Sequence, residues 1–258
     1  MSAAPRVYKT VAIVLRHRKL GEADKILTLF TANHGKLDAV AKGVRRPTSK
    51  LAGHVEPLTY STFLVAQGRE LDIVTQAETL EPLTPLREDL ERLGRGLCAV
   101  ELVDRLTPDR EESYPLFKLL LETLRRLATR DDLDLTLRYF EMQLLDELGY
   151  RPQLDRCVSC GAALEPTTNF WSAASGGVLC TACAAEEPLA QALSLSALKV
   201  LRVLQRGSFG EAARVRIAGA LDQELERDLR EYIRYVLERD LRSAAFLETL
   251  RRRKGARA

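Results

Sequence analysis

Four cysteines arranged as two C-x2-C pairs constrain the fold of this chain more than any other feature of its sequence. Cys157 and Cys160 form the first pair, and Cys180 and Cys183 form the second, with nineteen residues between the pairs. This is the spacing of a zinc ribbon, in which two turns together present four thiolates to a tetrahedral Zn²⁺. Because four thiolates leave no position for water, we predict one structural zinc ion. Disulfides or metal-free thiols are the alternative.

The cysteine usage also bears on the compartment and on the remaining thiol. Paired C-x2-C motifs suit metal binding in a reducing compartment, and no signal peptide or span of ~20 apolar residues is visible, so we expect a cytoplasmic protein without membrane contact. The fifth cysteine, Cys98, follows Leu97 at the edge of a helical apolar stripe. We expect it to be a buried thiol of the core rather than a nucleophile.

The first 81 residues have the pattern of a small β-barrel. Short runs rich in β-branched and apolar residues are separated by turn residues such as Asn33 and Gly35, or Gly68. Five strands in succession predict an OB-fold, with an SH3-like barrel as the alternative. The expected strands cover residues 7–17, 25–31, 36–42, 58–66 and 70–77.

From residue 82 onward the apolar period becomes that of helices, with stripes that begin near Leu86, Leu116 and Leu133. Ser196 is expected to cap a further helix, and one or two charged helices should follow from Leu221. The chain is therefore predicted to be an α+β multidomain protein, with an N-terminal five-stranded OB-fold barrel followed by an α-helical bundle that carries a four-cysteine zinc finger. The expected domains are 1–81 (barrel), 82–155 (helical, first part), 156–188 (zinc finger) and 189–258 (helical, C-terminal part).

Positive charge is concentrated at the N-terminal end of the chain. The net charge of the chain is +3, but residues 1–55 carry eleven Lys or Arg against three acids, which indicates a face that binds a polyanion. Gly43 and Ser49 could add an N–H and a hydroxyl donor to phosphate oxygens. A solvated loop is the ordinary alternative, and a second basic run at 251–257 is expected to be a disordered tail. The candidate DNA-binding residues are Arg16, Arg18, Lys19, Lys36, Lys42, Arg45, Arg46 and Lys50.

The sequence offers little support for an enzyme. His54 and Glu56 match the H-x-E element of zinc deaminases, but those enzymes use three protein ligands and a P-C-x-x-C segment, whereas Arg156 precedes Cys157 here. With three histidines in the chain and no nucleotide-binding or nucleophile motif, we expect no catalytic residue.

Several segments of the chain together resemble the bacterial RecO recombination-mediator family. The resemblance covers almost the whole chain and is carried by GEAD (21–24), VAKG followed by RR (40–46), LRYFE (137–141), LGY (148–150), the finger from Cys157 to Cys183, and the segment from Arg242 through Phe246 and Leu247.

The resemblance implies a role in recombinational DNA repair at the nucleoid. Members of the family bind single- and double-stranded DNA, anneal complementary strands, and act with RecR to load RecA onto strands coated by single-stranded-DNA-binding protein. Arg138 would then contact the acidic C-terminal tail of that protein, although an ion pair with Glu141 on the same helix is the alternative. A second hypothesis is an adaptor that acts mainly through protein contacts and binds DNA weakly.

Overall fold

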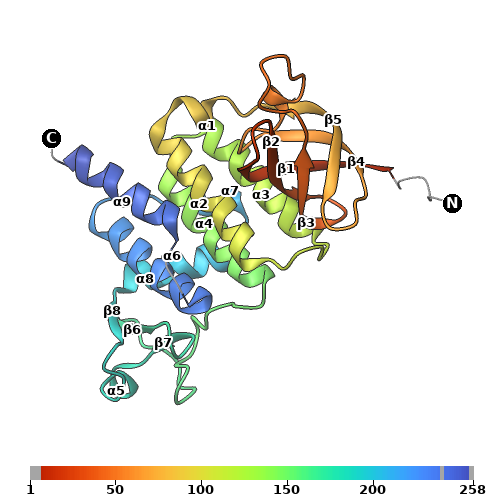
Figure 1. Ribbon diagram of the computed structural model, residues 1–258. Helices are drawn as coiled ribbons and strands as arrows, with labels where there is room; N and C mark the ends of the chain where they lie inside the picture. The colour runs from red at the N-terminus through yellow and green to blue at the C-terminus, as the bar shows by residue number, and fades with distance from the viewer. Residues whose placement is uncertain (1–6, 239–240, 256–258) are drawn as a thin grey trace. The chain divides into compact units, whose positions relative to one another are not determined.

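The computed structural model describes the backbone of residues 7–238 and 241–255 and the side chains of residues 7–238 and 241–250. Two compact units make up the chain: one extends to Thr129 and takes in the segment from Ser243 onward, and the other comprises residues 130–242. The first unit holds the strands of the basic region (Figure 1), and the second holds the cysteines.

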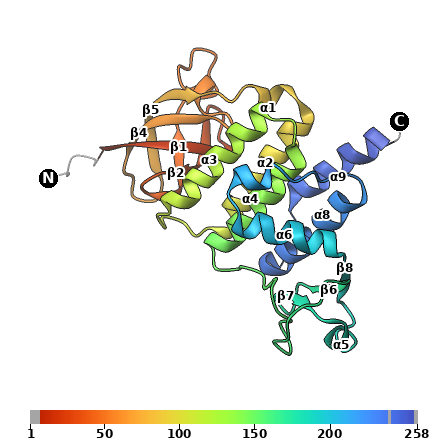
Figure 2. The same ribbon diagram turned by 180° about the vertical axis from the view of Figure 1, so that it is seen from behind.

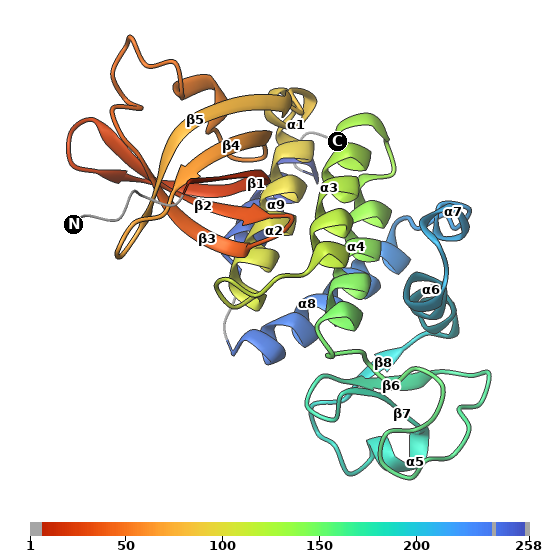
Figure 3. The same ribbon diagram turned by 90° about the vertical axis from the view of Figure 1, so that its right-hand side faces the viewer.

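The first unit is built on a closed five-stranded barrel with the strand order β1-β2-β3-β5-β4 (Figure 3). All neighbouring strands are antiparallel except β3 and β5, which pair in parallel. This order is that of an OB-fold and therefore decides against the SH3-like alternative. The strands are β1 (Val7–Leu20), β2 (Asp24–Thr31), β3 (Gly35–Ala41), β4 (Tyr60–Ala66) and β5 (Asp72–Glu81).

A β-bulge in β1 decides which way its cations point. Ala12 and Val14 face the barrel interior with Leu27 and Leu37, and simple alternation would send Arg16 inward as well. The register with β2 instead shifts between Val14 and Arg16, so the residues beyond the shift change face. Arg16 is therefore exposed on the outside of the barrel.

Helices of the first unit pack against the outside of the barrel. On α3, the ring of Phe117 lies 6.2 Å from that of Phe30 on β2 and 6.1 Å from that of Tyr60 on β4. The helices of this unit are α1 (Pro85–Glu88), α2 (Leu90–Leu106), α3 (Tyr114–Thr129) and α9 (Arg242–Gly255), and a 3-10 turn (Ala52–His54) precedes β4. The predicted domain 82–155 is thus divided between the two units, because its first helices share the core of the barrel unit.

Two expectations for these helices were wrong. The stripe that begins at Leu86 is interrupted, because the carboxylate of Asp89 accepts a hydrogen bond from Arg92 N at 2.9 Å and caps a new helix, which leaves Leu90 60% exposed. The basic run near the C-terminus is helical through Gly255, whereas Arg257 lies outside the described residues. Cys98 on α2 is buried, as predicted.

The second unit combines helices with a small three-stranded sheet of order β7-β6-β8 (Figure 2). Its elements are α4 (Leu133–Glu147), β6 (Asn169–Ser172), β7 (Gly177–Leu179), α5 (Thr181–Ala184), β8 (Gln191–Leu193), α6 (Leu195–Arg206), α7 (Phe209–Ala212) and α8 (Ala220–Leu237). The cap of α6 is Ser194, whose hydroxyl accepts a hydrogen bond from Ala197 N, rather than Ser196 as predicted. Across the described residues, no helix combines the length and apolarity that a bilayer span requires.

Candidate nucleic-acid interface and metal centre

Two loops at one end of the barrel are bound together by hydrogen bonds. Gly43 N donates to the Asp24 carboxylate at 2.7 Å, and the N–H and guanidinium of Arg45 donate to the carbonyls of Ala23 and Gly21 at 2.9 and 3.1 Å. These contacts join the β1–β2 turn to the segment that follows β3. The N–H of Gly43 is therefore already used and is not the phosphate donor that we expected.

Exposed cations lie on this bound pair of loops and at the adjoining end of β1. The side chain of Val44 is 2% exposed and belongs to the barrel core, so it anchors the segment between Lys42 and Arg45. Lys19, Lys42 and Arg46 are exposed and form no ion pair with any described residue. A rigid scaffold thus presents several uncompensated positive charges at one end of the barrel.

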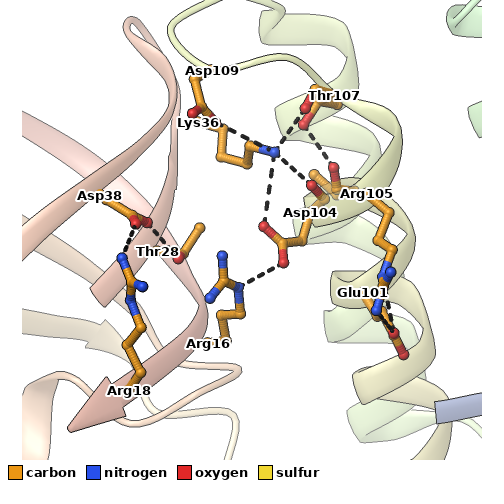
Figure 4. Close-up of polar contacts among 11 residues, drawn as sticks. Arg16, Arg18, Thr28, Lys36, Asp38, Glu101, Asp104, Arg105, Thr107 and Asp109 are labelled. Carbon is orange, nitrogen blue, oxygen red and sulfur yellow. Dashed lines mark hydrogen bonds and ion pairs between the residues drawn. The ribbon is translucent and has the colours of Figure 1, made fainter. Parts of the chain in front are cut away.

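Arg16 and Arg18 are exposed too, but each is already paired with an acid. Figure 4 shows Arg18 beside Asp38 of β3, at 3.1 Å, and Arg16 beside Asp104 of α2, at 2.7 Å. About half of each arginine side chain is accessible to solvent, so a phosphate could reach either guanidinium. Such exposed pairs contribute only about 0–1 kcal/mol to stability and are readily exchanged.

Lys36 is not part of an exposed face, and this corrects our expectation. Its residue is 9% exposed, and its ammonium donates to the carbonyl oxygens of Asp104 and Thr107 at 2.5 and 2.7 Å (Figure 4). The carboxylates of Asp104 and Asp109 lie 3.8 and 3.4 Å from the same nitrogen. The side chain fixes the C-terminal end of α2 to the barrel and has no capacity left for DNA.

A groove of about 530 Å³ lies on the outer surface of the barrel, beside the predicted cation Lys50. Lys9 of β1 contributes a second ammonium to its lining, Glu78 of β5 adds one acid, and Thr62 and Leu64 of β4 form part of its floor. Lys9 is not among the candidate residues from the sequence, although it occupies an outward-facing position of an alternating strand.

The four cysteines of the two C-x2-C pairs come together in the second unit. Their Sγ atoms all lie within 4.8 Å of one another, which suits a single metal ion. Cys180 caps α5, so Cys183 falls on the first turn of that helix. Gly177 allows the second pair to approach the first, because a Cβ there would lie 2.3 Å from the carbonyl oxygen of Gln153.

The environment of these thiols favours ionisation of at least one of them. Burial raises the pKa of Cys157, but backbone N–H groups of Cys160 and Cys180 outweigh this and lower it to about 6. Thiolates are the form that binds a metal ion. Soft sulfur ligands in a closed set of four fit Zn²⁺.

Arg138 is buried on α4 with its exposed fraction at 3%. Its guanidinium lies 3.0 Å from the carboxylate of Glu141, one turn further along the helix. This is the ion pair that the sequence left open as the alternative to a partner contact.

His54 and Glu56, the two residues of the deaminase-like motif, have structural contacts. His54 Nδ1 accepts a hydrogen bond from Thr79 N at 3.2 Å. Glu56 accepts a hydrogen bond from Lys25 at 3.1 Å. Burial raises the pKa of Glu56, but the combined effect of Lys25 and His17 is larger and lowers it below its usual value. Both residues help to hold the barrel.

The fold and the sites together define a class: OB-fold proteins whose barrel is followed in the chain by a helical region with four clustered cysteines that fit a metal ion. The family model for the N-terminal part of recombination protein O matches residues 1–83, and the model for its C-terminal part matches residues 87–245. The two models meet close to the change from strands to helices that the sequence indicates at residue 81. The chain belongs to the recombination protein O family.

Individual relatives agree with this assignment. The chain is similar to the DNA repair protein RecO of Roseiflexus sp. (strain RS-1), with 47% identity over 95% of this chain and 87% of the relative. The RecO proteins of Pelotomaculum thermopropionicum and Symbiobacterium thermophilum are 42% and 40% identical, over 94% and 95% of this chain and 94% and 98% of the relatives.

Proposed function

We propose that this protein is a non-enzymatic DNA repair factor that binds single- and double-stranded DNA and anneals complementary strands. In this role it acts with RecR to load RecA in recombinational repair. The observation that carries the proposal is a set of three exposed cations at one end of an OB-fold barrel: Lys19 at the end of β1, and Lys42 and Arg46 on the hydrogen-bonded segment after β3. Family membership and the names of the relatives support it.

Annealing requires no chemical step from the protein. A basic surface that neutralises phosphates lowers the repulsion between two strands, and release of condensed counterions favours the complex. The proposed DNA face consists of Arg16, Arg18, Lys19, Lys42, Arg45, Arg46 and Lys50, and it omits the buried Lys36. Because such contacts go to phosphates, binding should depend on salt and tolerate different base sequences.

The metal centre has a structural role in this proposal. Cys157, Cys160, Cys180 and Cys183 would hold one Zn²⁺, which closes the two turns upon each other. Bound by all four thiolates, the ion would cross-link the two turns and would have no position left for water.

DNA binding against salt concentration tests the proposed face. Replacing Lys42, Arg45 and Arg46 with alanine should flatten the slope of log affinity against log salt by roughly 2 for single strands, since each lost phosphate contact contributes about 0.7. Strand annealing should fall in parallel.

The second unit offers a matched control. Lys199, Arg214 and Arg216 are also one lysine and two arginines, and all three are exposed. Their triple alanine variant changes the net charge equally and should keep the wild-type slope. Equal losses in both variants would mean that overall charge, not this face, binds DNA.

The partner contact with the tail of single-stranded-DNA-binding protein is proposed at Arg138. Because Arg138 is buried beside Glu141, a tail that is acidic and apolar would have to replace Glu141 at the guanidinium. Arg138→Ala should then weaken binding of a peptide with the tail sequence. Unchanged affinity in a folded variant would leave Arg138 with only its helix ion pair.

A further inference from the structure

A single acid of β3 lies on the outer surface of the barrel among the proposed DNA-binding cations. In the strand register, Arg16 of β1 lies opposite Thr28 of β2, and Thr28 lies opposite Asp38 of β3. Arg18 follows Arg16 by two residues and is on the same face. Asp38 is therefore a neighbour of both arginines across the sheet.

The carboxylate of Asp38 is held in position by two hydrogen bonds. The hydroxyl of Thr28, a residue that is 2% exposed, donates to Oδ1 at 2.6 Å, and the guanidinium of Arg18 donates to Oδ2 at 3.1 Å (Figure 4). The buried threonine keeps the carboxylate in place whether or not Arg18 is bound to it. Its negative charge is thus a fixed property of the surface, whereas Arg18, with 56% of its side chain exposed, can move.

We propose that Asp38 is an internal competitor of DNA phosphate that limits the affinity of the DNA face. In the free protein the carboxylate of Asp38 is paired with Arg18 in the place that a phosphate oxygen would take. Arg18 therefore has few bound counterions that DNA binding could release. When DNA is bound, the carboxylate remains beside the strand and repels its phosphates. The inference deepens the proposed function and rests on it, since it identifies a residue that sets the strength of the same site.

A restrained affinity suits an annealing protein. A strand that is held by every available cation would be released slowly once it has paired with its complement. One fixed carboxylate inside the cationic face weakens the hold without removing any cation. Asp38 is the one acid in a stretch, residues 36–50, that otherwise carries five cations.

The other acid that pairs with this face, Asp104, has a different role. Its carboxylate contacts Arg16 and also lies 3.8 Å from the buried ammonium of Lys36. Neutralising Asp104 would disturb the attachment of α2 to the barrel. Asp38 contacts no buried cation among the residues that the structure describes, so its charge can be removed without this cost.

The test is Asp38→Asn, which retains an oxygen for the Thr28 hydroxyl and removes the charge. Binding of an oligothymidylate at low salt should tighten by about fivefold, which corresponds to one repulsive charge a few ångströms from a phosphate. The slope of log affinity against log salt should steepen by about 0.7, because Arg18 then releases its own counterion. Glu88→Gln, an equal change of charge at an exposed position of α1, is the control and should leave both values unchanged.

A double-mutant cycle identifies Arg18 as the cation concerned. Arg18→Ala should change the slope by less than about 0.2 in the wild type but by about 0.7 in the Asp38→Asn background. The measurement on the Arg18→Ala single variant keeps Asp38, so it remains informative even if Asp38→Asn unfolds. If Arg18→Ala alone changed the slope by about 0.7, the inference would be overturned.

The outcomes separate this inference from the proposed function. If the Lys42, Arg45, Arg46 variant loses binding but Asp38→Asn binds no more tightly than the wild type, the inference fails and the DNA face stands. An equal gain in Glu88→Gln would also overturn the inference, because overall charge would then explain it. If the triple variant binds DNA as well as the wild type does, the proposed face is wrong and the inference falls with it.

Discussion

Two lysines near the ends of strand β3, one within it and one directly after it, have opposite environments. At one end, Lys36 is buried and its ammonium is surrounded by oxygens of Asp104, Thr107 and Asp109. Directly after the other end, Lys42 is exposed and has no ion pair with a described residue. One cation therefore fixes a helix to the barrel, whereas the other remains available to a ligand.

This difference separates charges satisfied inside the fold from charges left to solvent. Removing a charge of the first kind leaves buried and partly buried partners unsatisfied, which destabilises the protein by several kcal/mol. Removing one of the second kind usually changes stability by no more than about 0.5 kcal/mol. Stability should thus respond to a residue within β3, and DNA binding to a residue directly after it.

The thiolates of the cysteine cluster are also charges satisfied inside the fold. Loss of this cluster should have the largest effect on stability. Cys157→Ser with Cys160→Ser should abolish the stoichiometric zinc and destabilise the second unit by about 4 kcal/mol or more, since binding of a structural metal contributes directly to folding. Elemental analysis and thermal unfolding measure both effects. Cys98→Ser, outside the cluster, should keep one zinc per chain. Wild-type protein purified under reducing conditions without stoichiometric metal would contradict the prediction.

Lys36→Ala tests the buried end of β3 directly. We expect a loss of about 3 kcal/mol in the free energy of unfolding, because two carbonyls and two carboxylates lose their cation. In folded protein, the salt slope of DNA binding should be unchanged. Lys42→Ala is the matched control, for which the reverse is expected. A stable Lys36→Ala variant with a flatter salt slope would show that Lys36 belongs to the DNA face after all.

Asp228→Asn tests the effect of a buried charge in the second unit, where the residue is an acid. Burial raises the pKa of Asp228 to about 7, with Arg227 opposing the shift and Glu224 and Glu231 adding to it. Between pH 4 and 7 the folded state therefore binds a proton that the unfolded state lacks, so the contribution of Asp228 to stability falls as pH rises.

The asparagine, neutral at every pH, should stabilise the protein by about 1–3 kcal/mol at pH 8 and by little at pH 4. Melting temperatures of both proteins across this range give the measurement. A difference that does not change with pH would mean that Asp228 is ionised throughout.

The smallest effect on stability is expected for the exposed cations that follow β3. The Lys42, Arg45, Arg46 alanine variant should unfold within about 0.5 kcal/mol of the wild type, even though its DNA binding is strongly reduced. Chemical denaturation provides the comparison. A larger loss would indicate that the hydrogen bond from the guanidinium of Arg45 to Gly21 O contributes more to the barrel than an exposed contact should.

Features with local signals could be predicted from the sequence without a structure. The spacing of the C-x2-C pairs predicted the tetracysteine cluster, and the change from alternating to helical periods predicted a five-stranded barrel followed by helices. Each C-x2-C pair, strand and hairpin is recognised from residues that are close in sequence, and the nineteen-residue spacing then joins the two cysteine pairs. Identifying the candidate DNA face as a basic region required only counting charges.

Which of those charges are available to a ligand depends on the tertiary fold. The bulge after Val14 turns Arg16 outward, and the carboxylate of Asp24 takes the N–H of Gly43. Lys36 is buried because it meets the end of α2, about seventy residues further along the chain. The free energy of a charge depends on all the groups within a few ångströms, and most of these are brought there by distant parts of the chain, so no local pattern of residues could distinguish Lys36 from Lys42.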